Sequence, residues 1–273
     1  MECPESKHLA GEATPGLHGF SDPEGNTVHG FEAIFPIVRQ IDEDCLELVG
    51  TGFFINENGL FVSAKHVLLE PFDQNSNQTH PIALLHLWPN YEYLIRHITW
   101  CSSHNTADVA IGFVEPEASP VTNASLRNKV LTLTTSSPRI GETVVTYAYP
   151  KTRVEQIGSK QVLNLKPAFY DGKLEEYLPN GEGLLKGPCY RTNIFIHGGA
   201  SGGPVVGKFG RVFAINSASF NGAENTSCVS RIDEIIGLEV CNLKLSNGQE
   251  VKSTTVLELA HCGWIDFDPP LTG

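Results

Sequence analysis

Residues 198–206 decide the fold, and they read Gly-Gly-Ala-Ser-Gly-Gly-Pro-Val-Val. Four glycines and a proline around one serine predict a tight turn that brings the backbone N–H groups of Gly199 and Ser201 close together. Two amide donors aimed at one point beside a hydroxyl are what the tetrahedral intermediate of an acyl transfer requires. The alternative interpretation is an ordinary glycine-rich hairpin loop, and only the rest of the chain distinguishes the two.

The pattern Gly-x-Ser-x-Gly also occurs in the nucleophile elbow of α/β-hydrolases. Ser201, Asp233 and His261 follow one another in the order that those enzymes use. That elbow needs a helix directly after the serine, whereas residues 202–206 cannot start a helix and are typical of a strand. The alternation of strands and helices that such a fold demands is also missing upstream. We therefore reject the hydrolase-elbow interpretation.

The rest of the chain consists of short β-branched and aromatic runs separated by turns such as Asn58-Gly59. The first group of predicted strands comprises residues 34–38, 46–55, 60–64, 82–87, 93–100 and 109–114. The second group comprises residues 130–134, 143–148, 161–165, 192–196, 205–207 and 212–215. Two such groups predict an all-β fold of two antiparallel six-stranded β-barrels with few short helices.

The same pattern sets the expected domain boundaries. Residues 1–29 are rich in Gly, Pro, Glu and His and have no periodicity, so we expect a loose N-terminal extension. The domain is expected to span residues 30–245, with the first barrel at 30–118 and the second at 125–245. Residues 246–273 form a C-terminal segment that we expect to pack on the body.

A serine hydroxyl is a weak nucleophile until an imidazole accepts its proton, so a histidine in a defined position is needed. Among ten histidines, His66 stands out because it follows two strand-like runs, residues 50–55 and 60–64, and a turn of small residues. Asp108 follows a polar turn and begins an apolar run, which predicts a carboxylate buried against an imidazole. An isolated aspartate in this place is more often a simple turn residue.

On these segments the sequence resembles the trypsin-like (chymotrypsin-fold) serine peptidases. That family has the same nucleophile loop before a strand, a Gly-x-Gly-Phe strand leading to its histidine, and an Asp-x-Ala segment between the two. The resemblance covers residues 31–240 and implies a catalytic triad of His66, Asp108 and Ser201. It also implies an oxyanion hole made by the backbone N–H groups of Gly199 and Ser201.

The resemblance implies a serine endopeptidase that hydrolyses peptide bonds of a protein or peptide substrate through an acyl-enzyme, without a metal or organic cofactor. Two alternatives stay open. One is a latent protease that a protein activator switches on, in a stress or defence role; the other is a catalytically silent, protease-like binding module. Silent relatives usually lose a triad residue, and this chain keeps all three.

By the family's layout, four residues bind the substrate, namely Phe195, Asn216, Ser217 and Ser219. Phe195 is expected at the base of the primary pocket, and the Ser217 hydroxyl is expected near Asp108. No acid stands at the pocket base, so a preference for Arg or Lys is disfavoured unless Glu224 reaches in from a neighbouring loop. We expect an uncharged P1 residue.

Three departures from the family carry further expectations. Ala200 stands where members activated from zymogens have an aspartate that pairs with a freed N-terminus, so activity should not require N-terminal processing. Val67 replaces a cysteine that often follows the histidine, as suits reduced, intracellular members. Lys65 stands where a small residue is common, and we expect its ammonium to reach solvent.

The composition excludes other classes of function. The 273 residues carry a formal net charge of -12, which repels a phosphate backbone, so nucleic acid is not an expected partner. No apolar run is long enough to span a bilayer, and membrane is not an expected partner either. Seven widely spread cysteines without a C-x-x-C pair indicate neither zinc nor a redox motif. Without a signal peptide, they predict a reducing, cytoplasmic location.

Overall fold

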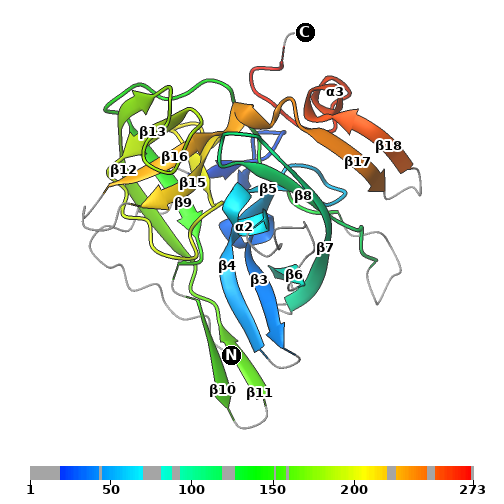
Figure 1. The fold of residues 1–273 in the computed structure, drawn as a ribbon. Coiled ribbons are helices and arrows are strands. Elements are labelled where there is room, and N and C mark those ends of the chain that lie inside the picture. The colour runs from blue at the N-terminus through cyan, green and yellow to red at the C-terminus, as the bar shows by residue number, and fades with distance from the viewer. Residues whose placement is uncertain are drawn as a thin grey trace.

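Two closed β-barrels form the body of the protein (Figure 1). The structure is a computed structural model. The residues that it describes are 19–42, 45–69, 81–87, 93–118, 127–150, 152–157, 160–219, 226–244 and 250–271. Each barrel has six antiparallel strands, and short helices are few, so the predicted fold class is confirmed.

The first barrel closes in the strand order β3-β4-β5-β8-β7-β6. Its strands are β3 (Ile34–Asp42), β4 (Cys45–Phe54), β5 (Leu60–Ser63), β6 (Ile82–Leu87), β7 (Tyr93–Ser103) and β8 (Ala110–Val114). Gly59 closes the predicted hairpin between β4 and β5 with a φ of 117°, a conformation that favours glycine. Three phenylalanine rings meet inside this barrel. The centroid of the Phe35 ring lies 4.5 Å from that of Phe54 and 5.5 Å from that of Phe61.

The second barrel closes in the order β12-β13-β16-β15-β14-β9. Its strands are β9 (Thr143–Ala148), β12 (Ala168–Leu178), β13 (Cys189–Thr192), β14 (Pro204–Val206), β15 (Val212–Ser219) and β16 (Ser227–Arg231). The strand β14 directly follows the glycine-rich loop, as the sequence predicts. No helix begins directly after Ser201, since β14 begins at Pro204, which agrees with the rejection of the hydrolase elbow.

Three of the strands predicted for the second barrel do not coincide with its strands. Residues 130–134 contain only an isolated bridge at Leu133, and of residues 192–196 only Thr192 belongs to a strand, as the last residue of β13. Residues 161–165 overlap β11 (Lys160–Asn164), which pairs with β10 (Arg153–Ile157) in a separate hairpin. The sequence missed β12 because its side chains are mostly polar and only Leu174 is fully buried.

Two short strands correct the expectation of a loose extension over residues 1–29. The strands β1 (Phe20–Ser21) and β2 (Thr27–Val28) pair with each other, and Phe20 and Val28 are buried. Phe20 packs against Tyr147 of β9 with ring centroids 6.3 Å apart. Two-residue strands are too short for a periodic pattern, so their burial depends on contacts distant in sequence. Residues 1–18 lie outside the described part.

The C-terminal segment packs on the body. The strands β17 (Glu239–Lys244) and β18 (Glu250–Thr255) form a hairpin, and the helix α3 (Val256–His261) follows. Val256, Leu259 and Phe267 are buried in the main hydrophobic core. The other helices are α1 (Gly30–Ala33), α2 (Lys65–Leu69) and the 3₁₀ turn η1 (Ile232–Ile235). None of the helices in the described ranges is long and apolar enough to cross a membrane.

A buried cation anchors both sides of the segment between the barrels. Arg96, 3% exposed, donates hydrogen bonds to Asn128 Oδ1 at 2.6 Å and to the Glu115 carbonyl at 2.8 Å. Its guanidinium lies 5.4 Å from the Phe54 ring centre. The Nδ1 atom of His86 lies 3.4 Å from Arg96 Nη1. Burial and the Arg96 charge lower the pKa of His86 to about 4.

His86 makes the free energy of unfolding depend on pH. In the unfolded chain His86 titrates near its ordinary pKa of 6.5, so between pH 6.5 and 4 the unfolded state binds the extra proton. Its contribution is complete above pH 6.5 and is lost as the pH falls toward 4. Urea unfolding at pH 7 and pH 5 should show a stability loss for the wild type that exceeds the loss for His86→Leu by about 2 kcal/mol. Equal losses in the two proteins would contradict the assignment.

Candidate active site

His66 and Asp108 are hydrogen-bonded to each other. His66 lies on α2, directly after β5, and Asp108 ends the turn between β7 and β8. The imidazole Nδ1 lies 2.9 Å from Asp108 Oδ2 and 3.1 Å from Oδ1, and the His66 backbone N–H donates to Oδ1 at 3.1 Å. The Asp108 side chain is 11% exposed. A carboxylate on Nδ1 keeps the proton on that nitrogen and leaves Nε2 as the base.

The predicted nucleophile loop, residues 198–203, consists of two consecutive turns. The Ala200 N–H donates to the His197 carbonyl at 3.1 Å, and the Gly203 N–H donates to the Ala200 carbonyl at 3.0 Å. Gly199 and Gly202 have φ values of 88° and 84°, which favour glycine. The turns therefore explain why glycines stand on both sides of Ala200-Ser201.

Thr51 of β4 joins this loop to the first barrel. Its N–H donates to the Ser201 carbonyl at 2.8 Å, and its hydroxyl donates to the Gly199 carbonyl at 2.8 Å. A side chain at Gly50 would place its Cβ 2.9 Å from the Ser201 carbonyl oxygen and 2.5 Å from Val67. Gly50 therefore lies between Ser201 and α2, so the backbones that carry Ser201 and His66 approach each other across it.

Asn216 supports the same loop from below. The side chain is fully buried, and its Nδ2 donates to Thr146 Oγ1 at 2.7 Å and to the Ala200 carbonyl at 3.2 Å. The backbone carbonyl of Asn216 accepts from the Gly202 N–H at 2.7 Å. We expected Asn216 beside the substrate pocket; the structure places its side chain in the barrel interior, where it holds the loop.

The other predicted substrate-binding residues lie near the end of β15 and before the loop. Phe195 is 40% exposed, and its ring centroid lies 4.3 Å from that of His197. Ser219 is exposed at the end of β15. The hydrogen bond that the structure gives the Ser217 hydroxyl is with Ser230 Oγ, at 2.7 Å, where we expected Asp108 as its neighbour. Glu224 lies outside the described residues.

Lys65 behaves differently from the expectation. Its ammonium does not simply reach solvent but donates to the carbonyls of His104 and Asn105, at 2.8 and 3.1 Å. These carbonyls belong to the turn that ends at Asp108, so Lys65 links the two segments of the His66–Asp108 pair. The sequence signal was a lysine where the family has a small residue, and solvation of a long cation was the simpler interpretation.

The second barrel also contacts the Asp108 turn. A Cβ on Gly187 would lie 2.5 Å from Ala107 Cα and 2.8 Å from its nitrogen, so only a glycine allows this approach. Ala107 itself is buried. The turn that carries Asp108 is therefore packed directly against the segment before β13. Sequence analysis did not identify Gly187, because a close backbone approach leaves no local pattern.

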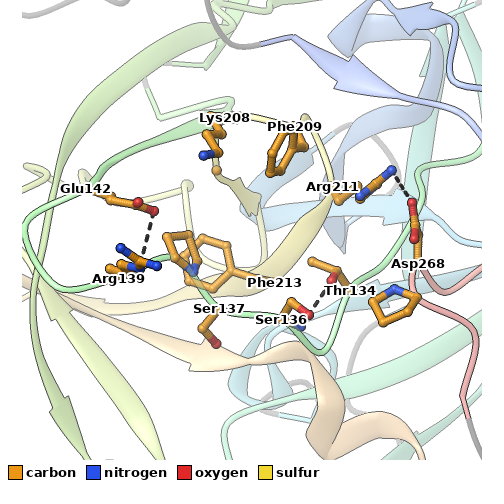
Figure 2. A pocket seen from close by; sticks show the side chains of 13 residues that line it. Thr134, Ser136, Ser137, Arg139, Glu142, Lys208, Phe209, Arg211, Phe213 and Asp268 are labelled. Carbon is orange, nitrogen blue, oxygen red and sulfur yellow. Dashed lines mark hydrogen bonds and ion pairs between the residues drawn. The ribbon is translucent and has the colours of Figure 1, made fainter.

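A cavity of about 450 Å³ lies elsewhere on the second barrel (Figure 2). It contains none of the predicted site residues; its walls come from the segments 134–142, 207–213 and 268–269. Arg211 pairs with Asp268 there, and the Lys208 ammonium lies 4.8 Å from the centre of the Phe209 ring. Within the described ranges, no three His, Cys, Asp or Glu side chains are grouped so that they could hold a metal ion.

The family follows from comparison with known proteins. Residues 50–215 match the trypsin-like peptidase domain, and the chain belongs to that family. It is a serine protease, a hydrolase of peptide bonds. Comparison with curated protein sequences gives no match.

Solved structures show the same fold at low identity. The crystal structure of Deg5 is 16% identical, with a TM-score of 0.53 over 75% of this chain and 86% of that one. An inactive form of Rv3671c from M. tuberculosis H37Rv, with alanine in place of a serine, is 18% identical. Its TM-score is 0.50 over 75% of this chain and 83% of that one.

Two glycines of the loop give a matched test of this packing. A Cβ at Gly202 would lie 2.2 Å from Ser63 Oγ and from the Thr51 carbonyl, whereas a Cβ at Gly198 meets nothing within 4 Å. Gly202→Ala should displace Ser201 and lower kcat/KM for a peptide substrate by about 100-fold. Gly198→Ala should stay within about threefold of the wild type. Similar rates for both variants would refute the close packing at Gly202.

Proposed function

We propose that the protein is an endopeptidase whose catalytic triad is His66, Asp108 and Ser201. The observation that carries the proposal is the Nδ1 hydrogen bond between His66 and Asp108 at 2.9 Å, on a helix that packs beside the Ser201 backbone. The carboxylate fixes the tautomer in which Nε2 can accept a proton. The loop of positive-φ glycines supplies the local geometry for paired amide donors.

The reaction proceeds through an acyl-enzyme. His66 Nε2 takes the proton of the Ser201 hydroxyl as Oγ attacks the scissile carbonyl carbon, and the C–O bond forms. The N–H groups of Gly199 and Ser201 hold the negative oxygen. His66 then gives its proton to the leaving amine as the C–N bond breaks. Water then attacks the acyl carbon as His66 takes its proton, the bond between that carbon and Oγ breaks, and His66 returns the proton to Ser201 Oγ as the acid product leaves.

The substrate is a protein or peptide with an uncharged residue at P1. Support comes from the apolar ring of Phe195, half exposed before the nucleophile loop and packed on His197. Ala200 is buried and has no carboxylate to pair with a new N-terminus, which supports activity without N-terminal processing. The cysteine pattern and Val67 favour action inside the cell, in a reducing compartment.

Labelling with a fluorophosphonate probe tests the nucleophile. The wild type should gain one probe mass at Ser201, and Ser201→Ala should gain none.

Asp108→Asn should lower kcat for a cleaved peptide by about 10⁴, because nothing then keeps the His66 proton on Nδ1. Cleavage of a peptide library by the wild type, with Ser201→Ala as the control, gives the P1 preference.

The same labelling distinguishes the alternatives. An unlabelled wild type would refute the proposal and favour a silent binding module. A wild type that labels and cleaves peptides only after addition of cell extract would favour a latent protease with a protein activator.

A further inference from the structure

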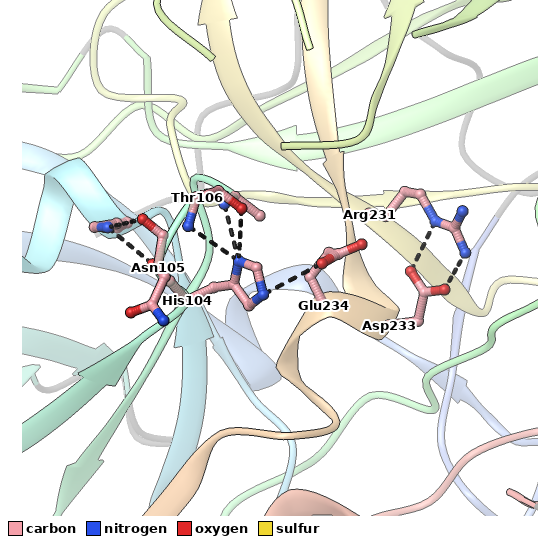
Figure 3. A network of polar contacts seen from close by, with 8 residues as sticks. His104, Asn105, Thr106, Arg231, Asp233 and Glu234 are labelled. Atoms are coloured by element: carbon pink, nitrogen blue, oxygen red, sulfur yellow. Dashed lines mark hydrogen bonds and ion pairs between the residues drawn. The ribbon is translucent and has the colours of Figure 1, made fainter. Parts of the chain in front are cut away.

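A second histidine–carboxylate pair involves the same turn that carries Asp108. His104 begins the turn between β7 and β8, and Glu234 belongs to η1 beyond the second barrel. His104 Nε2 lies 3.5 Å from Glu234 Oε2, and the two side chains are 31% and 20% exposed. Figure 3 shows the imidazole between the backbone of its own turn and the Glu234 carboxylate.

The other imidazole nitrogen of His104 holds the turn itself. Its Nδ1 accepts from the Ala107 N–H at 2.9 Å and from the Thr106 N–H at 3.3 Å. A nitrogen that accepts two N–H groups carries no proton, so the imidazole proton is on Nε2, facing Glu234. The backbone N–H of His104 also donates to the Val109 carbonyl at 3.0 Å and closes the turn.

The two acidic residues of η1, Asp233 and Glu234, have different partners, and Glu234 faces His104. Its neighbour Asp233 is paired with Arg231, whose guanidinium also bonds to the Tyr177 hydroxyl. The hydrogen bond to Asp233 raises the pKa of Arg231. Figure 3 shows this pair on the side of η1 away from His104. Asp233 is thus paired with a residue of the second barrel, whereas Glu234 contacts His104 of the first barrel.

We propose that His104 and Glu234 are positioning residues: Glu234 fixes the imidazole of His104, and His104 fixes the turn that places Asp108 against His66. The inference rests on the proposed triad. Lys65 holds the carbonyl side of the same turn, and Gly187 supports Ala107 from the second barrel. The placement of Asp108 therefore depends on contacts from both barrels.

Two substitutions of His104 test the roles of its two ring nitrogens separately. Asn keeps an oxygen near the Nδ1 position, where it can accept from the turn N–H groups, but does not reach Glu234. Gln can still donate toward Glu234 but has no acceptor beside the turn. His104→Gln should lower kcat about tenfold with KM unchanged, and His104→Asn should lower it about threefold. His97→Gln, at an exposed position on β7, is the matched control and should have no effect.

Glu234 tests the link across the barrels. Glu234→Gln can still accept from Nε2–H and should keep kcat within about twofold, whereas Glu234→Ala should match His104→Asn. The double variant His104→Asn/Glu234→Ala should be no slower than either single variant, because both break the same link. Glu239→Ala, at the exposed start of β17, is the control.

A readout independent of turnover is the downfield proton NMR signal of the His66 Nδ1–H that Asp108 accepts. It should shift or broaden in His104→Gln and Glu234→Ala, while their melting temperatures stay close to that of the wild type. Unchanged kcat and signal in both variants, or losses confined to KM or to melting temperature, would overturn the inference. A wild type that the fluorophosphonate does not label would instead remove the triad itself, and this inference with it.

Discussion

The candidate active site depends on Thr51, which links the loop of residues 198–203 in the second barrel to a strand of the first. Its N–H and hydroxyl hold the carbonyls of Ser201 and Gly199, both at 2.8 Å. Catalysis by a serine needs its hydroxyl within hydrogen-bonding reach of an imidazole from a different barrel. A backbone N–H and a short hydroxyl are well suited to this, because they fix the two segments in position without long side chains that must be ordered.

Close packing makes the glycines around this contact necessary. Gly50 separates Ser201 from α2, Gly202 lies against Ser63 and Ala64, and Gly187 lies against Ala107. At each place a Cβ would come within 3 Å of atoms from a different segment. The two barrels therefore approach each other at backbone distance around the site, and few side chains separate them. Reacting groups placed by main-chain packing move little, which favours catalysis by orientation.

Much of this could be predicted from the sequence, because the fold class and the three site segments have local patterns. The turn before β14, the Asn58-Gly59 hairpin and the order of His66, Asp108 and Ser201 needed no distant information. The structure pairs His66 with Asp108, and the roles of all three residues in the reaction stay a prediction.

The rest depended on contacts between distant segments. The strand β12 contains four charged residues that interrupt its apolar ones, so its sequence is not distinguished from a loop. Phe20 is buried against Tyr147 of β9 and Phe169 of β12, both distant in sequence. Lys65 was predicted to reach solvent because no pattern in the sequence shows that two carbonyls of another turn lie within its reach. Asn216 is a similar case. The sequence does not distinguish a polar residue that lines a pocket from a buried polar residue that hydrogen-bonds to the backbone of a loop.

The most direct test of the central claim is a crystal structure of the wild type with a peptide boronate of uncharged P1. We predict a tetrahedral boron bonded to Ser201 Oγ, with one boronate oxygen facing the N–H groups of Gly199 and Ser201. His66 Nε2 should lie within hydrogen-bonding distance of the adduct while Nδ1 keeps Asp108. A boronate bound away from Ser201, or an adduct with His66 turned out of reach, would contradict it.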